Sequence, residues 1–496
     1  MQSTSSSVRG RRATVLLLLL TLAAWIVISD GQAAAQDADQ QVGPTHAPLP
    51  PPAAPVNPTA PAEQSPAVPG EPGAPAFAQP NASAPLRYDT EYPPMHYEGL
   101  AQSNRIARLQ VRLDRGEVKL DFESGHGYLR SLLKALDIDP SSQVLVYSKT
   151  SLQTGEIQAA SPRALYFNED TYVGWVQGTQ QIELGTMDST LDQVFYTLKN
   201  GSPAGAHFKR ETTNCLGCHD SLSYSGGGVP RFLLMSTYVD THGNALTHEG
   251  SILVTDRTEF QYRWGGWYVT GHQGSEIHLG NLLVHNVQEL THLDGLRRGN
   301  LDNLDALFDT KPYLTDKSDI VALQVLLHQS TVQNRITEVN WDTRTALAKA
   351  GKDPADGHGV TLPAQMRKQI QDEMDALVDE MLFVGDPGYK SPLAGNSGFD
   401  KWFQARGPRD RRGRSLRELD LTTRLFKYPC SFLIYSEAFD ALPVYARDYL
   451  YARLVKILTG KELSSQYAVL SAADRKAVVE ILKDTKPQFA AALKGG

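Results

Sequence analysis

Short runs rich in apolar residues, separated by polar and turn-forming residues, dominate the middle of the chain. They are rich in β-branched and aromatic side chains, which is typical of strands. The runs lie at residues 143–148, 164–168, 171–176, 231–239, 251–255 and 260–271. The last run contains Gly265 and Gly266, and this pair predicts a bulge or a close approach of two backbone segments.

A helical spacing of apolar residues interrupts these strand-like runs. Leu191, Val194 and Leu198 recur with a period near 3.6 and would share one face of a helix. Ser189 and Asp192 have the spacing of a capping box, which marks a helix N-terminus. We therefore expect a helix over residues 191–198.

Two longer helices are predicted in the second half of the chain. One covers about residues 318–350, where Val321, Val325 and His328 begin a single apolar stripe. The other covers about residues 363–383, and its stripe is rich in methionine. A methionine stripe at helical spacing indicates a packed helix face.

The last hundred residues are predicted to be mainly helical. Gly460 ends one helix, and Ser471 with Asp474 caps the next. The segment 405–419 is strongly basic in an otherwise acidic protein. It is interpreted either as a solvated surface loop or as a docking patch for an acidic redox partner.

These patterns predict an α+β fold with a helix-rich C-terminal part. We expect a domain of mixed strands and helices over residues 87–400, with residues 401–496 packed on it as a helical part. The length after residue 87 is ample for one large core or two domains.

The N-terminal segment predicts export. Three arginines precede an apolar run over residues 13–29, and small residues before Gln36 suit cleavage. Residues 1–35 are therefore expected to be either a cleaved signal peptide or an N-terminal anchor, which would be the only link to a membrane. Residues 36–86 are rich in proline and alanine and predict a disordered linker. The expected location is the periplasm or cell envelope.

Charge and cysteine content argue against two classes of protein, those that bind nucleic acid and those held together by disulfides. The net charge is −7 and the pI is near 6, so the chain lacks the basic balance of a nucleic-acid-binding protein. Only three cysteines are present, an odd number that does not suit a disulfide framework. Cys430 lies in an apolar, strand-like run and is expected to be a buried, unreactive thiol.

The other two cysteines lie in the stretch NCLGCHD, which contains a C-x-x-C-H motif. Cys215 and Cys218 have the spacing that reaches the two vinyl groups of one haem, and His219 is then placed as the proximal iron ligand. The motif predicts one haem c per chain, bound through two thioethers. A dithiol redox site and a zinc half-site remain as alternatives.

The sixth iron ligand is open at this stage. His278, in a glycine-bounded loop, and His328, on the stripe of the long helix, are the leading candidates; His272 and Met235 are weaker ones. An open sixth site is a further alternative. Arg263 is a candidate contact to a haem propionate, or else an exposed arginine of a structural strand.

Several stretches resemble one family of proteins. They are TYVGWVQG, the C-x-x-C-H motif with its trailing GGGVP, RWGGWYVTG, HLGN and KYPCSFLIYSEAFDALP. Together they are similar to large exported bacterial cytochrome c domain-containing proteins with a single C-x-x-C-H motif. The resemblance covers most of the chain after about residue 87. It implies haem attachment at Cys215 and Cys218 and ligation by His219, and it implies no substrate.

Three functions follow from these observations. The first is an electron-transfer cytochrome that serves a redox partner protein in the cell envelope. The second is a haem enzyme, peroxidase-like or oxidase-like, with an open sixth iron site. Some 400 residues around one haem exceed what a simple carrier needs, which keeps this alternative open. The third is an envelope-tethered haem sensor.

Overall fold

The computed structural model describes residues 91, 93–221, 228–293 and 297–495. The predicted signal segment, the predicted linker and the first two residues of the GGGVP stretch lie outside the described residues. The described residues belong to one compact unit. Among them, no helix is both long enough and apolar enough to span a bilayer.

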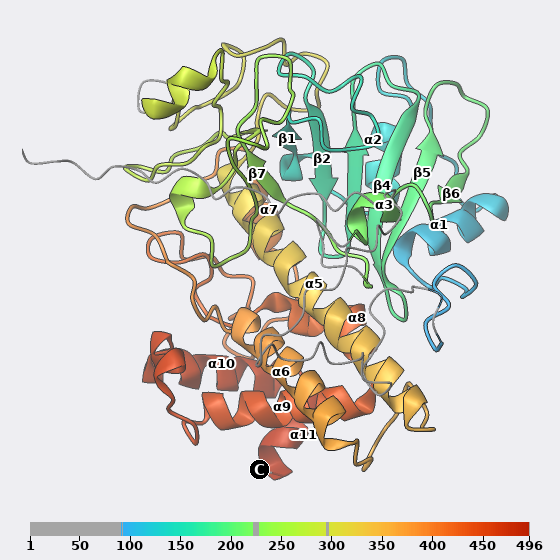
Figure 1. Ribbon diagram of the computed structural model, residues 1–496, viewed down its shortest axis with the longest axis vertical. Helices are drawn as coiled ribbons and strands as arrows, with labels where there is room; N and C mark the ends of the chain where they lie inside the picture. The colour runs from blue at the N-terminus through green and yellow to red at the C-terminus, as the bar shows by residue number, and fades with distance from the viewer. Residues whose placement is uncertain (1–90, 92, 222–227, 294–296, 496) are drawn as a thin grey trace, which may run out of the picture. The chain divides into compact units, whose positions relative to one another are not determined.

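A seven-stranded antiparallel sheet forms one part of this unit (Figure 1). Its strand order is β6-β5-β4-β3-β2-β1-β9. The strands are β1 (Val144–Val146), β2 (Arg163–Phe167), β3 (Thr171–Trp175), β4 (Gln181–Asp188), β5 (Asp192–Lys199), β6 (Phe208–Arg210) and β9 (Trp267–Tyr268). A separate two-stranded sheet pairs β7 (Met235–Thr237) with β8 (Ser251–Leu253).

The other regular elements of the unit are helices. They are α1 (Arg105–Asp114), α2 (Leu129–Ala135), α3 (Leu216–His219), α5 (Ile320–Lys349), α6 (Ala364–Met381), α7 (Phe399–Gln404), α8 (Glu437–Asp440), α9 (Val444–Leu458), α10 (Ala472–Thr485) and α11 (Pro487–Gly495). Short 3-10 helices are η1 (Pro140–Ser142), η2 (Phe260–Tyr262), η3 (Val287–Thr291), η5 (Phe432–Tyr435) and η6 (Ser465–Val469). The predicted α+β class, with a helical C-terminal part, is confirmed.

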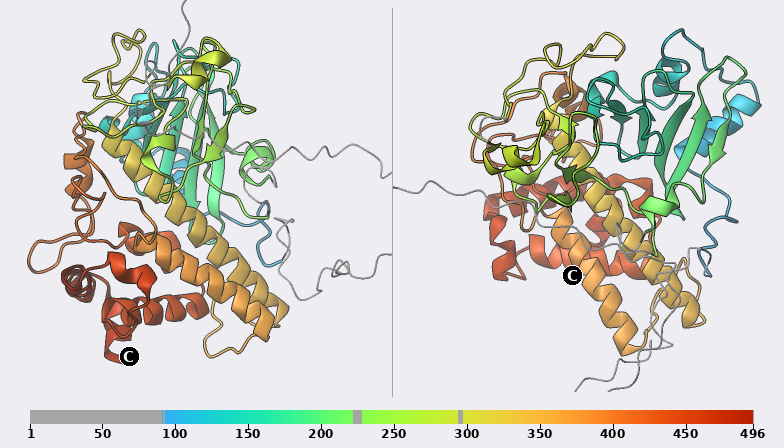
Figure 2. Two further views of the ribbon diagram at one scale, coloured as in Figure 1. Left: turned by 60° about the vertical axis from the view of Figure 1, so that its left-hand side comes forward. Right: turned by 45° about the horizontal axis from the view of Figure 1, so that its top comes forward.

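The long helix α5 joins the sheet to the helical part. In Figures 1 and 2 it runs diagonally from the sheet to the region of α6 and α9. Asp319 caps its N-terminus by accepting hydrogen bonds from the amides of Val321 and Ala322. One face of the sheet and α5 share a hydrophobic core with α6 and α9, whereas the opposite face packs against α1 and α2. The sheet is therefore buried on both faces.

The helix predicted over residues 191–198 is wrong, because these residues form β5. Asp192 has φ of 58°, which suits the β4–β5 turn and not the first turn of a helix. Seven of the eight residues of β5 are buried, since helices cover both faces of the sheet. A strand that is buried on both sides does not alternate apolar and polar residues. The apolar residues of β5 therefore also fit the spacing expected of a helix.

Other local predictions have clearer outcomes. A Cβ on Gly265 would lie 2.6 Å from the carbonyl oxygen of Thr237, so the predicted close approach is confirmed. Cys430 is fully buried as predicted, and burial raises the pKa of its thiol to about 12. The strand expected around it is wrong, because the chain there forms η5. The capping box of Ser471 and Asp474 at α10 is confirmed.

The basic segment 405–419 is tied to α10 by ion pairs. Arg411 lies 2.6 Å from Asp484, and both Arg412 and Arg414 lie 2.9 Å from Glu480. Much of the positive charge of the segment is therefore balanced within the chain. This favours a structural surface loop over a free docking patch.

Candidate functional site

One helical turn brings the three residues of the C-x-x-C-H motif together. Cys215 caps α3, and its carbonyl oxygen accepts hydrogen bonds from the amides of Cys218 at 3.2 Å and His219 at 3.0 Å. Cys215 and Cys218 are both free thiols; the first is half-buried and the second is exposed. Two thiols and one imidazole thus project from a single turn, which is the donor set that covalent haem requires.

The imidazole of His219 is fixed by a backbone carbonyl. Its Nδ1 lies 2.6 Å from the carbonyl oxygen of Arg231, and the amide of Arg231 donates to the carbonyl oxygen of His219 at 2.9 Å. Because a carbonyl oxygen only accepts, Nδ1 carries the proton and Nε2 keeps a free lone pair. Burial lowers the pKa of His219 to about 4, so the ring is neutral at pH 7. A neutral imidazole with this tautomer is the form that binds a metal.

Helix α5 holds the segment that supplies this carbonyl. Glu338 lies 2.7 Å from the guanidinium of Arg231, and both side chains are mostly buried. Asn334, one turn earlier on α5, accepts from the amide of Phe232 and donates to its carbonyl oxygen, each at 2.9 Å. Residues 231 and 232 are therefore clamped to α5 by two side chains four residues apart. The orientation of His219 depends on this clamp.

The turn lies against the side of the sheet that faces α5. The ring of Phe195 on β5 is 4.3 Å from the ring of His219, centroid to centroid. Arg163 on β2 and Glu183 on β4 form an ion pair at 2.8 Å. Both of these charges act on the pKa values of His219 and Cys215. The motif thus combines an aromatic contact with a balanced charge pair.

The environment of Cys215 does not activate it as a nucleophile. Burial, with the negative charges of Glu183 and Glu211 as further causes, raises the pKa of the Cys215 thiol to about 12. A redox-active dithiol instead needs a lowered thiol pKa, because the thiolate is the attacking form. This disfavours the dithiol alternative.

His328 lies in a different environment. It is fully buried, its Nδ1 lies 2.8 Å from Asp256 Oδ2, and its Nε2 lies 2.8 Å from Ser431 Oγ. The ring also stacks on Phe383 at 4.5 Å. Both ring nitrogens are already used, so this histidine keeps no lone pair for iron in this arrangement. The order Asp256, His328, Ser431 resembles a catalytic triad, but Ser431 is fully buried and presents no surface to a substrate.

His278 is also buried, and its tautomer is the reverse of that of His219. Its Nδ1 accepts a hydrogen bond from the amide of Gly280 at 3.0 Å, so Nε2 carries the proton. No partner for Nε2 exists among the described residues. Burial lowers the pKa of His278 to about 4. The sixth-ligand prediction for His278 remains a prediction, and it requires the ring to change its tautomer.

Arg263 is buried at 3% exposure, so its interpretation as an exposed arginine is wrong. Its guanidinium donates to Gln324 Oε1 at 2.6 Å and to the carbonyl oxygens of Thr258 and Asp256, each at 2.8 Å. These partners belong to the surroundings of His328. The propionate contact of Arg263 stays a prediction that these hydrogen bonds do not favour.

The two weaker ligand candidates lie elsewhere. Met235 is a half-buried residue of β7, and its carbonyl oxygen accepts from the indole of Trp267. His272 is largely exposed and lies 3.3 Å from Asp302. The structure therefore brings the two cysteines together with His219. The other predicted site residues, His278, His328, Arg263, Met235 and His272, contact residues outside the motif.

Sequence reasoning missed the residues that position His219. Arg231 positions His219 through its backbone carbonyl. Because every residue type has this group, the residue type at position 231 could not predict the contact. Glu338 and Asn334 are more than 100 residues away along the chain. Their spacing of four on a predicted helix was visible, but polar residues on a helix are ordinarily solvent-facing.

Across the described ranges, no group of three or more His, Cys, Asp and Glu side chains is arranged to hold a metal ion.

Known proteins give no independent guide to this site. Comparison of the chain with protein families, with curated proteins and with solved structures finds no match. The resemblance to cytochrome c domain-containing proteins therefore stays a prediction.

Proposed function

We propose that this chain is an exported c-type cytochrome that carries one haem c and takes part in electron transfer. One observation carries the proposal above the others. His219 donates from Nδ1 to the carbonyl oxygen of Arg231 and keeps Nε2 free, on the same turn as two free thiols. A motif that arose by chance would not need its histidine held in the metal-binding tautomer.

Each residue of the motif has a distinct role in this proposal. Cys215 and Cys218 would hold a haem through two thioether bonds, and Nε2 of His219 would be the proximal ligand. When bound, haem supplies a one-electron iron couple. The chain contributes the fixed direction of the imidazole, through the carbonyl of Arg231 and the clamp by Glu338. A ligand held in one geometry needs little rearrangement when the charge at the iron changes.

The surroundings of the motif support a partly buried, weakly charged site. Phe195 packs on the imidazole, and the nearby ion pair of Arg163 with Glu183 carries no net charge. Such a pair stabilises neither oxidation state strongly by itself. The expected partner is a redox protein of the cell envelope, and the expected location is the periplasm or envelope.

The haem-enzyme alternative differs at the sixth iron position. Neither His278 nor His328 keeps a free ring lone pair, which leaves that alternative in contention. A closed sixth position favours electron transfer, and an open one favours binding or activation of a small molecule.

A pyridine haemochrome spectrum is the decisive experiment. The full chain is produced with the haem-maturation machinery, beside a variant with Cys215→Ser and Cys218→Ser. We expect covalent haem in the wild type and none in the variant, with Cys430→Ser as a matched control that keeps its haem. Absence of covalent haem in the wild type would refute the proposal. Carbon monoxide added to the reduced protein then separates the alternatives, because rapid binding would favour the enzyme over the carrier.

A further inference from the structure

A buried arginine outside the motif lacks adequate partners. Arg417 is only 7% exposed, and its guanidinium packs against the rings of Phe403 and Phe432, at 4.8 and 4.6 Å from their centroids. Both distances are within the range of cation–π contacts. The five N–H donors point outward from its edge and still require acceptors.

Few such acceptors are provided by the described residues. Of the described residues, only Glu169 bonds the guanidinium of Arg417, and the distance is 3.5 Å. The same carboxylate lies closer to Arg105, at 3.0 Å. Burial lowers the pKa of Arg417 to about 10, so this cation is poorly compensated where it lies.

The edge of this guanidinium opens into a cavity of about 460 Å³. Phe432 and Leu433 are its buried apolar lining, while Gly407 and Pro408 are exposed residues at its margin. Arg406 lines it as well and is held by Asp137 at 2.7 Å. The cavity has the size of a small-molecule site, and its lining sets charged and polar side chains beside an apolar base.

Gly407 keeps the space above Arg417 open. It has φ of +82°, and a Cβ there would lie 3.1 Å from Nε of Arg417. A larger residue would be strained and would press on the guanidinium. The backbone therefore leaves the edge of Arg417 accessible from the cavity.

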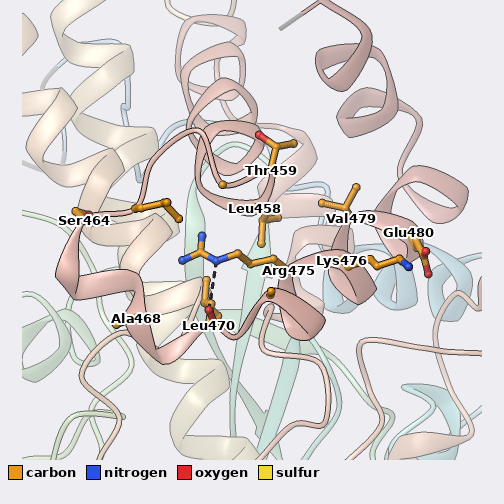
Figure 3. A pocket seen from close by; sticks show the side chains of 12 residues that line it. Leu458, Thr459, Ser464, Ala468, Leu470, Arg475, Lys476, Val479 and Glu480 are labelled. Carbon is orange, nitrogen blue, oxygen red and sulfur yellow. Dashed lines mark hydrogen bonds between the residues drawn. The ribbon is translucent and has the colours of Figure 1, made fainter.

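Arg475 shows how this chain satisfies a buried arginine that serves structure alone. It lines a separate cavity of about 720 Å³ between α9 and α10 and is 8% exposed (Figure 3). Its guanidinium donates to the carbonyl oxygens of Leu470, Tyr467 and Ile457. Arg475 has three backbone acceptors where Arg417 has one distant carboxylate.

We propose that the cavity at Arg417 binds a small organic monocarboxylate. The carboxylate of the ligand accepts hydrogen bonds from the free edge of Arg417, with Arg406 beside it, because a guanidinium fork matches a carboxylate. The apolar part of the ligand packs on Phe432 and Leu433. This site is separate from the proposed haem function and does not depend on it.

The charge of the lining selects one negative charge rather than two. Arg406 and Arg417 face Glu169, and Asp137 pairs with Arg406, so the lining has no excess positive charge that could balance two negative charges. A phosphate dianion would be repelled by Glu169 and would find no partner for its second charge. The lining therefore discriminates against inorganic phosphate.

Saturation-transfer NMR on the full chain tests this site, with sodium butyrate as the probe and inorganic phosphate as competitor. We expect saturable butyrate binding that phosphate weakens only at much higher concentration. Arg417→Gln should weaken binding about tenfold or more. Arg411→Gln removes a nearby exposed arginine that does not line the cavity, and it should leave binding unchanged.

A second variant covers the case in which Arg417→Gln does not fold. Arg406→Gln changes a partly exposed residue, so the fold should survive, and butyrate binding should weaken severalfold. Equal competition by phosphate would show that the cavity does not select a monocarboxylate. Unchanged binding in a folded Arg417→Gln or Arg406→Gln protein would show that butyrate binds elsewhere, and either result would contradict the proposal. No saturable butyrate binding by the wild type would overturn the proposal directly.

Discussion

His219 and His328 use their ring nitrogens differently, and this difference distinguishes the site of the C-x-x-C-H motif from the site around the buried His328. In each ring Nδ1 donates to an oxygen, a backbone carbonyl for His219 and the carboxylate of Asp256 for His328. Nε2 of His328 also accepts from Ser431, whereas Nε2 of His219 has no hydrogen-bond partner among the described residues. A histidine prepared for a ligand is half-satisfied, and a structural one is fully satisfied.

The supports of the two rings differ as well. His219 depends on a main-chain atom that α5 holds indirectly, through Arg231 and Glu338. His328 depends on two side chains, and each is lost by a single substitution. If the chain binds haem as proposed, we expect the two sites to respond to mutation differently: substitutions at the first change the haem spectrum, and substitutions at the second lower stability.

The largest expected effect is loss of the native haem spectrum on His219→Gly. The thioethers remain possible because both cysteines are present, but the proximal ligand is gone. Added imidazole should restore the spectrum in part, since it fills the space left by the side chain. Absorption spectra with and without imidazole make the measurement. A native spectrum in His219→Gly without imidazole would contradict the assignment of the ligand.

The next effect is on stability, at the second histidine. His328→Ala removes two buried hydrogen bonds and leaves the carboxylate of Asp256 without the Nδ1 donor. We expect a loss of about 3–5 kcal/mol in the free energy of unfolding, measured by urea titration. His358→Ala is the matched control, because His358 forms an exposed pair with Asp448 and should change stability by less than about 0.5 kcal/mol.

The haem spectrum of folded His328→Ala decides between the two roles of that residue. We expect it to match the wild type, because neither ring nitrogen is free for iron. A shift to a high-spin spectrum would instead identify His328 as the sixth ligand and would end the contrast with His219.

A third effect concerns pH and the carboxylate next to the buried histidine. Glu380 is 3% exposed, and burial, with the charge of Asp256 as a further cause, raises its pKa from 4.5 to about 7. Between these two values the unfolded chain releases a proton that the folded chain keeps. The contribution of Glu380 to stability is therefore present below pH 4.5 and is lost as the pH rises to about 7.

Glu380→Gln removes this titration. The stability of the variant relative to the wild type should rise between pH 4 and pH 8, by up to about 3 kcal/mol, as measured by urea unfolding at both pH values. Gln keeps an acceptor for Arg257, which lies 3.3 Å from the carboxylate. A difference that stays constant with pH would show that the pKa of Glu380 is not raised.

The contrast between the two histidines was only partly predictable from the sequence. The C-x-x-C-H spacing predicted the grouping of Cys215, Cys218 and His219, because residues within one helical turn need no tertiary information. The apolar stripe predicted the burial of His328, which is confirmed. The partners Asp256 and Ser431 lie 72 and 103 residues away along the chain, and only the fold brings them to the ring.

The strand β5 shows the same limit in the backbone. Its apolar spacing fitted a helix, and nothing local contradicted that fit except the run of β-branched and aromatic residues around Phe195. The decision came from tertiary structure, since β4 pairs with β5 along its whole length and helices cover both faces of the sheet. Burial on both faces removes the alternation of apolar and polar residues by which a strand is recognised in a sequence.

The smallest expected effect tests the chain of contacts that joins the two regions. Glu338 accepts from Arg231, behind His219, and from Arg335, each at 2.7 Å, and Arg335 lies 4.0 Å from Glu380. Glu338→Gln leaves one acceptor oxygen for two arginines, so we expect a loss of about 1 kcal/mol in stability. It should also shift the reduction potential, because the carbonyl oxygen of Arg231 then holds the imidazole of His219 less firmly. Glu437→Gln, at an exposed pair with Arg108, is the control and should change neither property. If Glu338→Gln lowers stability while the potential stays at the wild-type value, the clamp supports the fold alone, and His219 is positioned by the backbone without help from α5.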